Sequence, residues 1–392
     1  MKKIRIGTAA SLMALTAAVT FVVTFSFSRK LFNEKVRDID GIAEKYERLD
    51  ELDRKVRAEY YKDIPEDDVT TGILMGYVAG LGDPYSAYRP TEQLTDYQEN
   101  NAGVYTGIGI SIVKNDEGYA LIVEVAENGS AQKAGIAAGD VLTEVEDISL
   151  KGDYKKAIDM IAGEVGTYVR IRIRKENSEK ETEYTLKREQ LDETTVYSEM
   201  LDGQIGYIRI TKFRSVSVGQ FADARKKLLD DGAKGFVFDV RDNGGGVLSA
   251  LEKMVDPILP EGELAFSYDR AGNPTTILKS DKECMKMPYV VLVNGATASA
   301  SELFACVLRD YSDAKLVGET TFGKGIMQTT FELTGGGVTL TTATYATGKT
   351  PCYHETGLEP DVQIVYDPEA EQDNQLEAAQ QTVAEMILQD AA

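Results

Sequence analysis

One strand-to-helix turn, within residues 288–328, constrains this chain more than any other feature. The apolar run from Tyr289 to Val293 has the length and composition of a buried strand. It ends at Asn294-Gly295, and after five small residues the apolar side chains recur at helical spacing: Leu303, Phe304, Val307, Leu308 and Tyr311. This pattern places Ser299 at a helix N-terminus, where free N–H groups and the helix dipole favour an oxyanion.

A lysine follows on a second tight loop. Lys324 lies between two glycines, 25 residues after Ser299, and Gln328 comes four residues later. A serine hydroxyl is inert until a base removes its proton, and a lysine amine can be that base. The spacing therefore suggests a Ser-Lys hydrolase. Two alternatives stay open on spacing alone: Ser301 competes with Ser299 as cap and nucleophile, and Lys324 can be an ordinary surface lysine.

Composition narrows the functional classes. At about 150 residues per domain, 392 residues predict two or three domains. The net charge of −21 argues against nucleic-acid binding, because phosphate contacts need clustered Lys and Arg. His354 is the single histidine and the three cysteines form no C-x-x-C pair, so we expect no metal site and no cofactor. Cys306 falls on the apolar side of the helix after Ser299 and is predicted to be core.

The N-terminus indicates the compartment. Ile6 to Phe27 is a stretch of 22 uncharged residues, preceded by Lys2, Lys3 and Arg5 and followed by Arg29-Lys30. That length can cross a bilayer as a helix. We predict a single-pass signal anchor that leaves the catalytic part extracytoplasmic, with secretion after signal-peptide cleavage as the alternative.

The remaining chain divides by its hydrophobic periodicity. Residues 31–102 have helical spacing, residues 103–190 alternate as short strands and turns, and residues 191–366 alternate strand and helix. In the last of these, strands are predicted at Gly206 to Ile210 and Phe236 to Val240, with a helix at Val216 to Leu229. Residues 1–30 would be the anchor and residues 367–392 a terminal helix. The predicted fold class is therefore an α+β and α/β multidomain protein.

Seven short motifs together resemble one family, over roughly residues 40–365. They occur in that family's order: G-D-P-Y-S-A-Y at 82–88, Y-T-G-I-G-I at 105–110, S-A-Q-K-A-G-I-A-A-G-D-V-L at 130–142, D-V-R-D-N-G-G-G at 239–246, A-S-A-S-E at 298–302, T-F-G-K-G-I-M-Q at 321–328 and G-L-E-P-D at 357–361. The family is that of the C-terminal processing, or tail-specific, serine peptidases with an internal PDZ domain. The resemblance implies a ClpP/crotonase-like βαβ protease core with an inserted PDZ-like domain.

The resemblance implies a role for each residue of the candidate site. Ser299 would be the nucleophile, Lys324 the general base and Gln328 the residue that orients the lysine. A lysine base must be neutral, so its pKa must fall from about 10.4 through burial, and a glutamine can hold the amine without adding charge. The oxyanion hole would use the N–H of Ala300 with one from Gly245 or Gly246, where glycine lets the backbone approach the substrate.

The PDZ-like module implies how substrates are chosen. The loop of Thr106, Gly107, Ile108, Gly109 and Ile110 would take a peptide's terminal carboxylate on backbone N–H groups, and the neighbouring strand would pair with the peptide. The implied function is a serine endopeptidase that cleaves exported proteins near free, apolar C-termini, with the PDZ domain gating activity. A homodimer through the terminal helical regions and a regulatory partner of unknown identity are further expectations.

Three other functions are weighed against this one. A catalytically dead PDZ scaffold would not need Ser299, Lys324 and Gln328 intact. A crotonase-like enzyme acting on thioesters would need a nucleotide-binding site, which nothing here resembles. A Ser-His-Asp hydrolase would have to use His354, and no G-x-S-x-G elbow surrounds Ser299.

Overall fold

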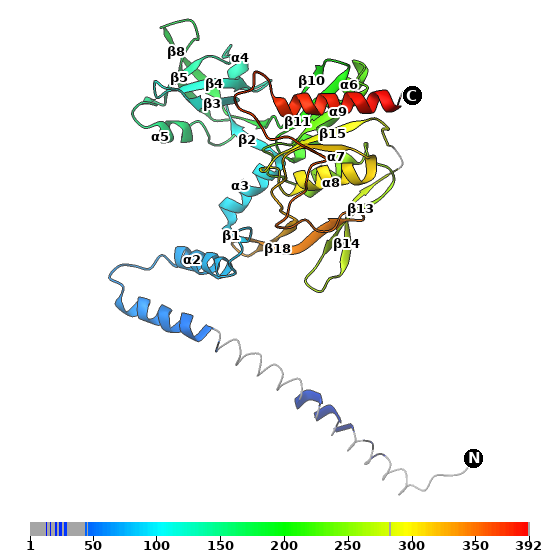
Figure 1. The fold of residues 1–392 in the computed structure, drawn as a ribbon. Coiled ribbons are helices and arrows are strands. Elements are labelled where there is room, and N and C mark those ends of the chain that lie inside the picture. The colour runs from blue at the N-terminus through cyan, green and yellow to red at the C-terminus, as the bar shows by residue number, and fades with distance from the viewer. Residues whose placement is uncertain are drawn as a thin grey trace, which may run out of the picture. The chain divides into compact units, whose positions relative to one another are not determined.

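A computed structural model describes residues 46–281 and 284–390, together with scattered positions between 13 and 44 (Figure 1). The chain divides into two compact units, residues 1–74 and residues 75–392. Among the described residues, no helix has the length and apolar character needed to cross a bilayer. The anchor predicted at residues 6–27 lies outside the described residues, apart from scattered positions.

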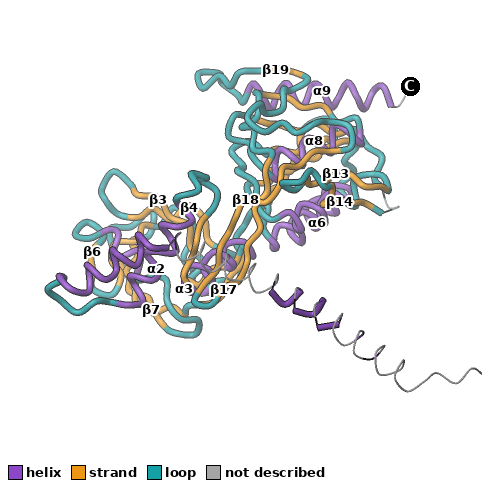
Figure 2. The backbone as a smooth tube through the Cα atoms, turned by 90° about the horizontal axis from the view of Figure 1, so that it is seen from below, coloured by secondary structure: helices purple, strands orange, loops and turns teal. Residues whose placement is uncertain are grey.

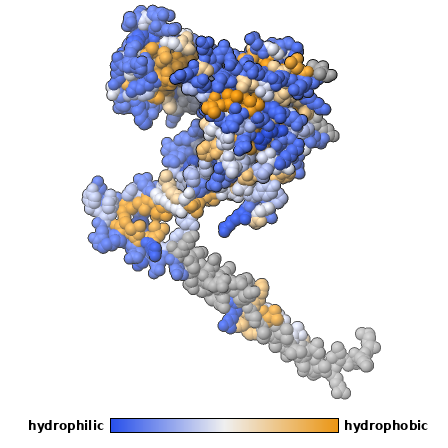
Figure 3. All heavy atoms as spheres, viewed as in Figure 1, coloured by the Kyte–Doolittle hydropathy of each residue, from blue (hydrophilic) through white to orange (hydrophobic). Residues whose placement is uncertain are grey.

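Helices predominate in residues 46–102. Residues 46–59 form one helix, and its surface carries ion pairs at i,i+4 spacing such as Arg54–Asp50 at 2.6 Å. Such exposed pairs add little stability. The helix α2 (Glu66–Ala79) begins with three acidic residues at the positive end of its dipole. Only Val78 of α2 is buried, and the side chains of Met75 and Tyr77 are exposed. Figure 3 shows apolar atoms, in orange, on the surface of this region.

Residues 104–192 fold as two antiparallel sheets with their own core. One sheet has the strand order β3-β4-β5-β7-β8, with β6 beside β5, and in the other β2 pairs with β9. The elements are β2 (Val104–Gly107), β3 (Ile110–Lys114), β4 (Ala120–Val125), α4 (Ser130–Lys133), β5 (Val141–Val145), β6 (Ile148–Ser149), α5 (Tyr154–Asp159), β7 (Tyr168–Arg174), β8 (Glu181–Lys187) and β9 (Glu189–Asp192). In β7, Val169, Ile171 and Ile173 are buried while the arginines between them are not, as a one-sided strand requires.

The largest core surrounds a six-stranded sheet of order β10-β11-β12-β15-β16-β19. Its strands are β10 (Val196–Leu201), β11 (Ile205–Ile210), β12 (Gly235–Asp239), β15 (Tyr289–Val293), β16 (Lys315–Gly318) and β19 (Val362–Gln363). Only the β10–β11 pair is antiparallel. Every residue of β12 and β15 is buried, as expected for parallel strands covered on both faces. The predicted strand at Tyr289 to Val293 and the α/β class are confirmed.

Helices cover both faces of this sheet. Phe236 and Phe238 face a cluster shared with α6 (Ser215–Asp230), α7 (Leu248–Val255) and α8 (Ala300–Ser312). Val237, between them, faces the opposite cluster with Val383 of α9 (Asn374–Asp390), which runs along this sheet (Figure 1). Cys306 is fully buried in the first cluster, which confirms its predicted core position, and all three cysteines are free.

A second sheet forms the wall of the candidate site. Its order is β1-β18-β13-β14, and β17 pairs with β18 as a long hairpin that is clear in Figure 2. The elements are β1 (Ala87–Pro90), α3 (Thr91–Ala102), β13 (Gly262–Tyr268), β14 (Pro274–Ser280), β17 (Ile326–Leu333) and β18 (Gly336–Thr347). Because Ala87 pairs with Thr339, residues 87–90 are held beside a strand far away in sequence.

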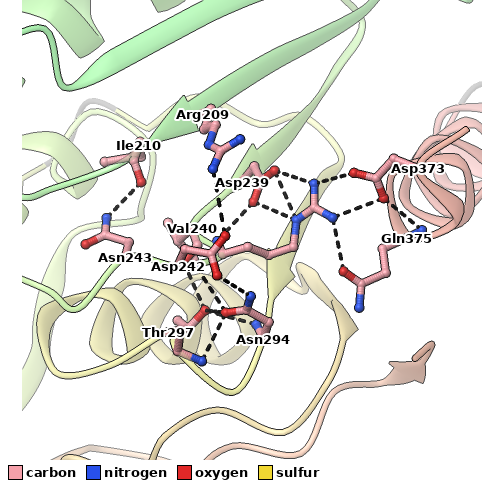
Figure 4. A network of polar contacts seen from close by, with 12 residues as sticks. Arg209, Ile210, Asp239, Val240, Asp242, Asn243, Asn294, Thr297, Asp373 and Gln375 are labelled. Atoms are coloured by element: carbon pink, nitrogen blue, oxygen red, sulfur yellow. Dashed lines mark hydrogen bonds and ion pairs between the residues drawn. The ribbon is translucent and has the colours of Figure 1, made fainter. Parts of the chain in front are cut away.

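A buried ionic network ties α9 to the end of β12 (Figure 4). Asp239 is fully buried and contacts Arg241 at 2.6 Å, and the same guanidinium contacts Asp373 at 2.8 Å and Gln375 at 3.0 Å. Tyr207 donates a further hydrogen bond to Asp239 at 2.8 Å. The network fixes the start of the loop at residues 241–246, which contributes to the site described next.

Candidate active site

Ser299 occupies a strained turn between β15 and α8. Its backbone has φ 59° and ψ −121°, in a region that non-glycine residues rarely adopt. The side chain is only half-buried, and it lines a cavity of about 370 Å³. Ser301, the competing serine, is fully buried and its Oγ has no hydrogen-bond partner among the described residues. Of the two hydroxyls, only that of Ser299 is open to a substrate.

Two backbone N–H groups near Ser299, those of Ala300 and Gly246, make no hydrogen bond among the described residues. Ala300 is the first residue of α8, so its N–H has no partner within the helix. Gly246 lines the same cavity. The residues on either side of it are bonded to Phe213: the Phe213 N–H donates to the Gly245 carbonyl, and the Val247 N–H donates to the Phe213 carbonyl. The N–H of Gly245 is already bonded to the Asn243 side chain at 2.9 Å. The N–H of Gly246 has no such partner among the described residues, and the choice between the two predicted glycines stays a prediction.

Side chains hold this glycine loop against the serine turn (Figure 4). Asn294 accepts a hydrogen bond from the Asp242 N–H at 3.0 Å and donates to its carboxylate at 2.8 Å. Thr297 donates to the Val240 carbonyl at 2.9 Å, and Asn243 donates to that of Ile210 at 2.8 Å. A Cβ at Gly245 would lie 2.8 Å from that of Ser299, so only glycine fits there.

Lys324 is half-buried, and its amine faces a tyrosine. Nζ lies 4.1 Å from the centre of the Tyr85 ring. Burial lowers the pKa of Lys324 below its ordinary value of 10.5, while the carboxylates of Asp83 and Glu302 act in the opposite direction. Among the hydrogen bonds of the described residues, none joins this Nζ to Ser299 or to Gln328. In this structure the lysine is beside the serine turn but is not bonded to the hydroxyl.

Glu302 joins the serine turn to the lysine loop. Its carboxylate is fully buried and accepts the N–H groups of Ser299 at 2.8 Å, Gly323 at 2.7 Å and Lys324 at 2.8 Å. It also accepts the Thr321 hydroxyl at 2.6 Å. Four donors to one buried carboxylate fix two loops relative to each other, because moving either loop would leave buried polar groups unpaired.

Gln328 and Tyr345 complete the cavity wall around Ser299. The Gln328 amide donates to the Thr341 hydroxyl at 3.1 Å, so its contact in this structure is with β18 and not with the lysine. The Tyr345 hydroxyl donates to the Lys324 carbonyl at 2.6 Å. Ser299 and Gln328 therefore line one cavity. Lys324 is joined to the wall of that cavity by the hydrogen bond between its carbonyl and Tyr345.

The predicted carboxylate-binding loop lies between β2 and β3. Thr106 and Gly107 end β2, and Ile110 begins β3. The carbonyls of Ile108 and Gly109 accept hydrogen bonds from Ala131 and Ala126, which fixes the backbone between them. β3 is an edge strand of its sheet, so one side of it carries free backbone groups.

Comparison with known proteins identifies the family. Residues 204–364 match the peptidase family S41, and residues 121–175 match the PDZ domain. The chain is 34% identical over 321 residues to the carboxy-terminal processing protease CtpA of Bacillus subtilis (strain 168), covering 81% of this chain and 68% of that protein. The chain belongs to the carboxy-terminal processing proteases. It is accordingly an S41 serine peptidase with a PDZ domain, whose substrates are proteins.

Two further similarities were found. A probable CtpA-like serine protease of Staphylococcus aureus (strain COL) is 31% identical over 358 residues, covering 89% of this chain and 70% of that protein. Among solved structures, the photosystem II D1 C-terminal processing protease is 29% identical and covers 84% of this chain and 90% of that one, with a TM-score of 0.48.

Sequence reasoning assigned no role to several residues that contact the site. Glu302 carried a usable signal, because Ser299-x-x-Glu302 is the spacing of a helix capping box. Asn243 carried no sequence signal beyond its place before three glycines. Tyr85 reaches Lys324 only through the pairing of β1 and β18, which no local pattern announces. Tyr345 reaches it through the hairpin of β17 and β18.

Proposed function

We propose that this processing protease uses Ser299 as its nucleophile and Lys324 as its general base to cut exported proteins near their C-termini. One observation carries the proposal: Ser299 sits at a strained helix N-terminus beside the free N–H groups of Ala300 and Gly246, and Glu302 clamps the lysine loop to the same turn. Attack of Oγ on the peptide carbonyl would give its proton to the neutral amine. The amine would then protonate the leaving nitrogen, and water would release the acyl group.

For this chemistry the Lys324 amine has to turn from Tyr85 towards Ser299. Burial lowers the pKa of this amine, which supports a population of the neutral base. We therefore expect kcat/KM to rise with pH, with an apparent pKa below 10.5. Gln328, on the wall of the same cavity, would orient the amine once it has turned.

The PDZ domain is proposed to recognise the substrate tail and to gate cleavage. The free edge of β3 supports this, because an extended peptide can add to it as a further strand while the loop at residues 106–110 takes the carboxylate. Apolar residues in the Ser299 cavity, among them Val247, Leu248 and Leu303, support an apolar segment at the cut site.

Tail recognition predicts a difference between two otherwise identical peptides. A peptide with a free, apolar C-terminus should be cut faster by roughly ten-fold or more than its C-terminal amide, because hydrogen bonds to a charged group are the strong ones. The measurement is kcat/KM for both peptides, with Ser299→Ala as the blank. Equal rates on both would exclude selection by the carboxylate and leave the catalytic assignment standing.

The other predictions concern the protein's setting. The uncharged stretch at residues 6–27 supports attachment to the cell membrane or secretion, with the catalytic part outside the cytoplasm. The division into residues 1–30, 31–102, 103–190, 191–366 and 367–392 stays a prediction, as do self-association through the terminal helical regions and a regulatory partner.

A further inference from the structure

The loop at residues 82–88 packs against the proposed base, although the proposed reaction gives it no role. Its Tyr85 ring receives the Lys324 amine at 4.1 Å from the ring centre, well within the range of a cation–π contact. The Tyr85 N–H donates to the Asp83 carboxylate at 3.0 Å, so the ring's position depends on this acidic residue. Both residues lie on one short turn before β1.

The same loop is also connected to Gln328. The Gln328 amide donates to the Thr341 hydroxyl at 3.1 Å, and the Thr341 N–H donates to the Ser86 hydroxyl at 3.1 Å. Ser86 in turn donates to Asp83 at 2.5 Å. A continuous set of hydrogen bonds therefore joins the residue proposed to orient the lysine to the turn that holds the lysine now.

Charged and titratable groups reach Lys324 from every side. Asp83 comes from this loop and Glu302 from α8, and their charges raise the pKa of the amine while burial lowers it more strongly. Tyr345 of β18 donates to the Lys324 carbonyl, and burial raises the pKa of its phenol, so it stays neutral. His354 Nδ1 lies 3.2 Å from the neighbouring Gly323 carbonyl, and the N–H of Glu355 donates to that carbonyl at 2.7 Å.

We infer that Tyr85 and Asp83 are positioning residues for Lys324, holding its protonated amine away from Ser299 and releasing it when the proton is lost. The inference rests on the proposed function of Lys324. Its physical basis is that the ring quadrupole attracts an ammonium ion but not a neutral amine. Deprotonation would thus both create the base and weaken the contact that keeps it from Ser299. The Asp83 carboxylate stabilises the charged state of the Lys324 amine and accepts a hydrogen bond from the Tyr85 backbone N–H.

The test compares two substitutions of the same ring. Tyr85→Leu removes the π face, so the Lys324 ammonium loses a stabilising contact. The rising limb of the pH profile of kcat/KM should therefore move to lower pH by about 0.5 to 1 unit. Tyr85→Phe keeps the face and should leave the limb within about 0.2 unit of wild type. Asp83→Asn keeps one acceptor oxygen but removes the charge, so it should move the limb in the same direction as Tyr85→Leu.

A second measurement does not depend on activity. In a Ser299→Ala background, the Cε resonance of Lys324 is titrated by NMR in protein labelled with ¹³C-lysine and is assigned by its loss in Lys324→Arg. The titration midpoint should be lower with Tyr85→Leu than with Tyr85→Phe. Equal midpoints for these two variants, or equal shifts of their activity limbs, would overturn the inference.

The two proposals fail in different ways. If Lys324→Ala keeps full activity, the catalytic role of the lysine is wrong, whatever the titration shows. If Lys324→Ala is inactive but Tyr85→Leu matches Tyr85→Phe in both measurements, the role of the loop is wrong and the Ser-Lys mechanism stands.

Discussion

Lys324→Ala is expected to lower kcat/KM on an unfolded protein substrate by about 10²- to 10⁴-fold, the usual contribution of a general base. The loss follows because no other basic side chain of the described site can take the Ser299 proton in its place. His354 is not placed to be the base for Ser299. Its Nδ1 contacts the Gly323 carbonyl at 3.2 Å, and no hydrogen bond joins it to Ser299. We therefore expect His354→Gln to stay within a few-fold of wild type.

The comparison of these two variants decides between two kinds of hydrolase. Lys324 is part of the loop at residues 323–325 and His354 contacts that loop, so a loss caused only by disturbing it should affect both variants. Cleavage of a casein-like unfolded protein gives the rates, and circular dichroism shows that each variant is folded. An active Lys324→Ala together with an inactive His354→Gln would replace the lysine mechanism with a serine–histidine one.

Glu302→Gln is expected to reduce both stability and activity, although Glu302 need not contact the substrate. Glutamine keeps one acceptor oxygen but directs an amide group at backbone N–H donors that need an acceptor. Leaving buried donors unpaired costs about 1–3 kcal/mol each, so a loss of about 3 kcal/mol is expected for the free energy of unfolding. Because the clamp sets the distance between Ser299 and the lysine loop, kcat/KM should also fall by roughly 10²-fold in the folded variant.

A nearby exposed carboxylate provides the control for this variant. Glu355 lies beside the same loop but its side chain is exposed, so Glu355→Gln should match wild type in both properties. Denaturant unfolding gives the stability, and kcat/KM is measured where each variant is fully folded. Wild-type kcat/KM in folded Glu302→Gln would show that the clamp does not position the catalytic groups.

Local sequence patterns predicted the elements of the protease core. Tyr289 to Val293 forms β15 with those bounds, and the helix predicted at Val216 to Leu229 is α6, Ser215–Asp230. The strand is encoded by a short continuous apolar run, and the helix by apolar residues that recur at helical spacing. The position of Ser299 at the following turn was predictable for the same reason.

Contacts between distant segments were not predictable from these patterns. Tyr85 meets Lys324 because β1 pairs with β18, and a pairing of segments some 250 residues apart leaves no local periodicity in the sequence. The hydrogen bond from the Gly245 N–H to the Asn243 side chain was likewise hidden, since it depends on the backbone conformation of that loop.

Covalent labelling tests the central claim most directly. A peptidyl fluorophosphonate should modify the protein once, at Ser299, because only that hydroxyl is both open to the cavity and placed beside the free N–H groups of Ala300 and Gly246. Peptide mass spectrometry locates the adduct, and labelling should slow sharply in Lys324→Ala. Modification of Ser301 instead, or full-rate labelling of Ser299 without the lysine, would contradict the proposed mechanism.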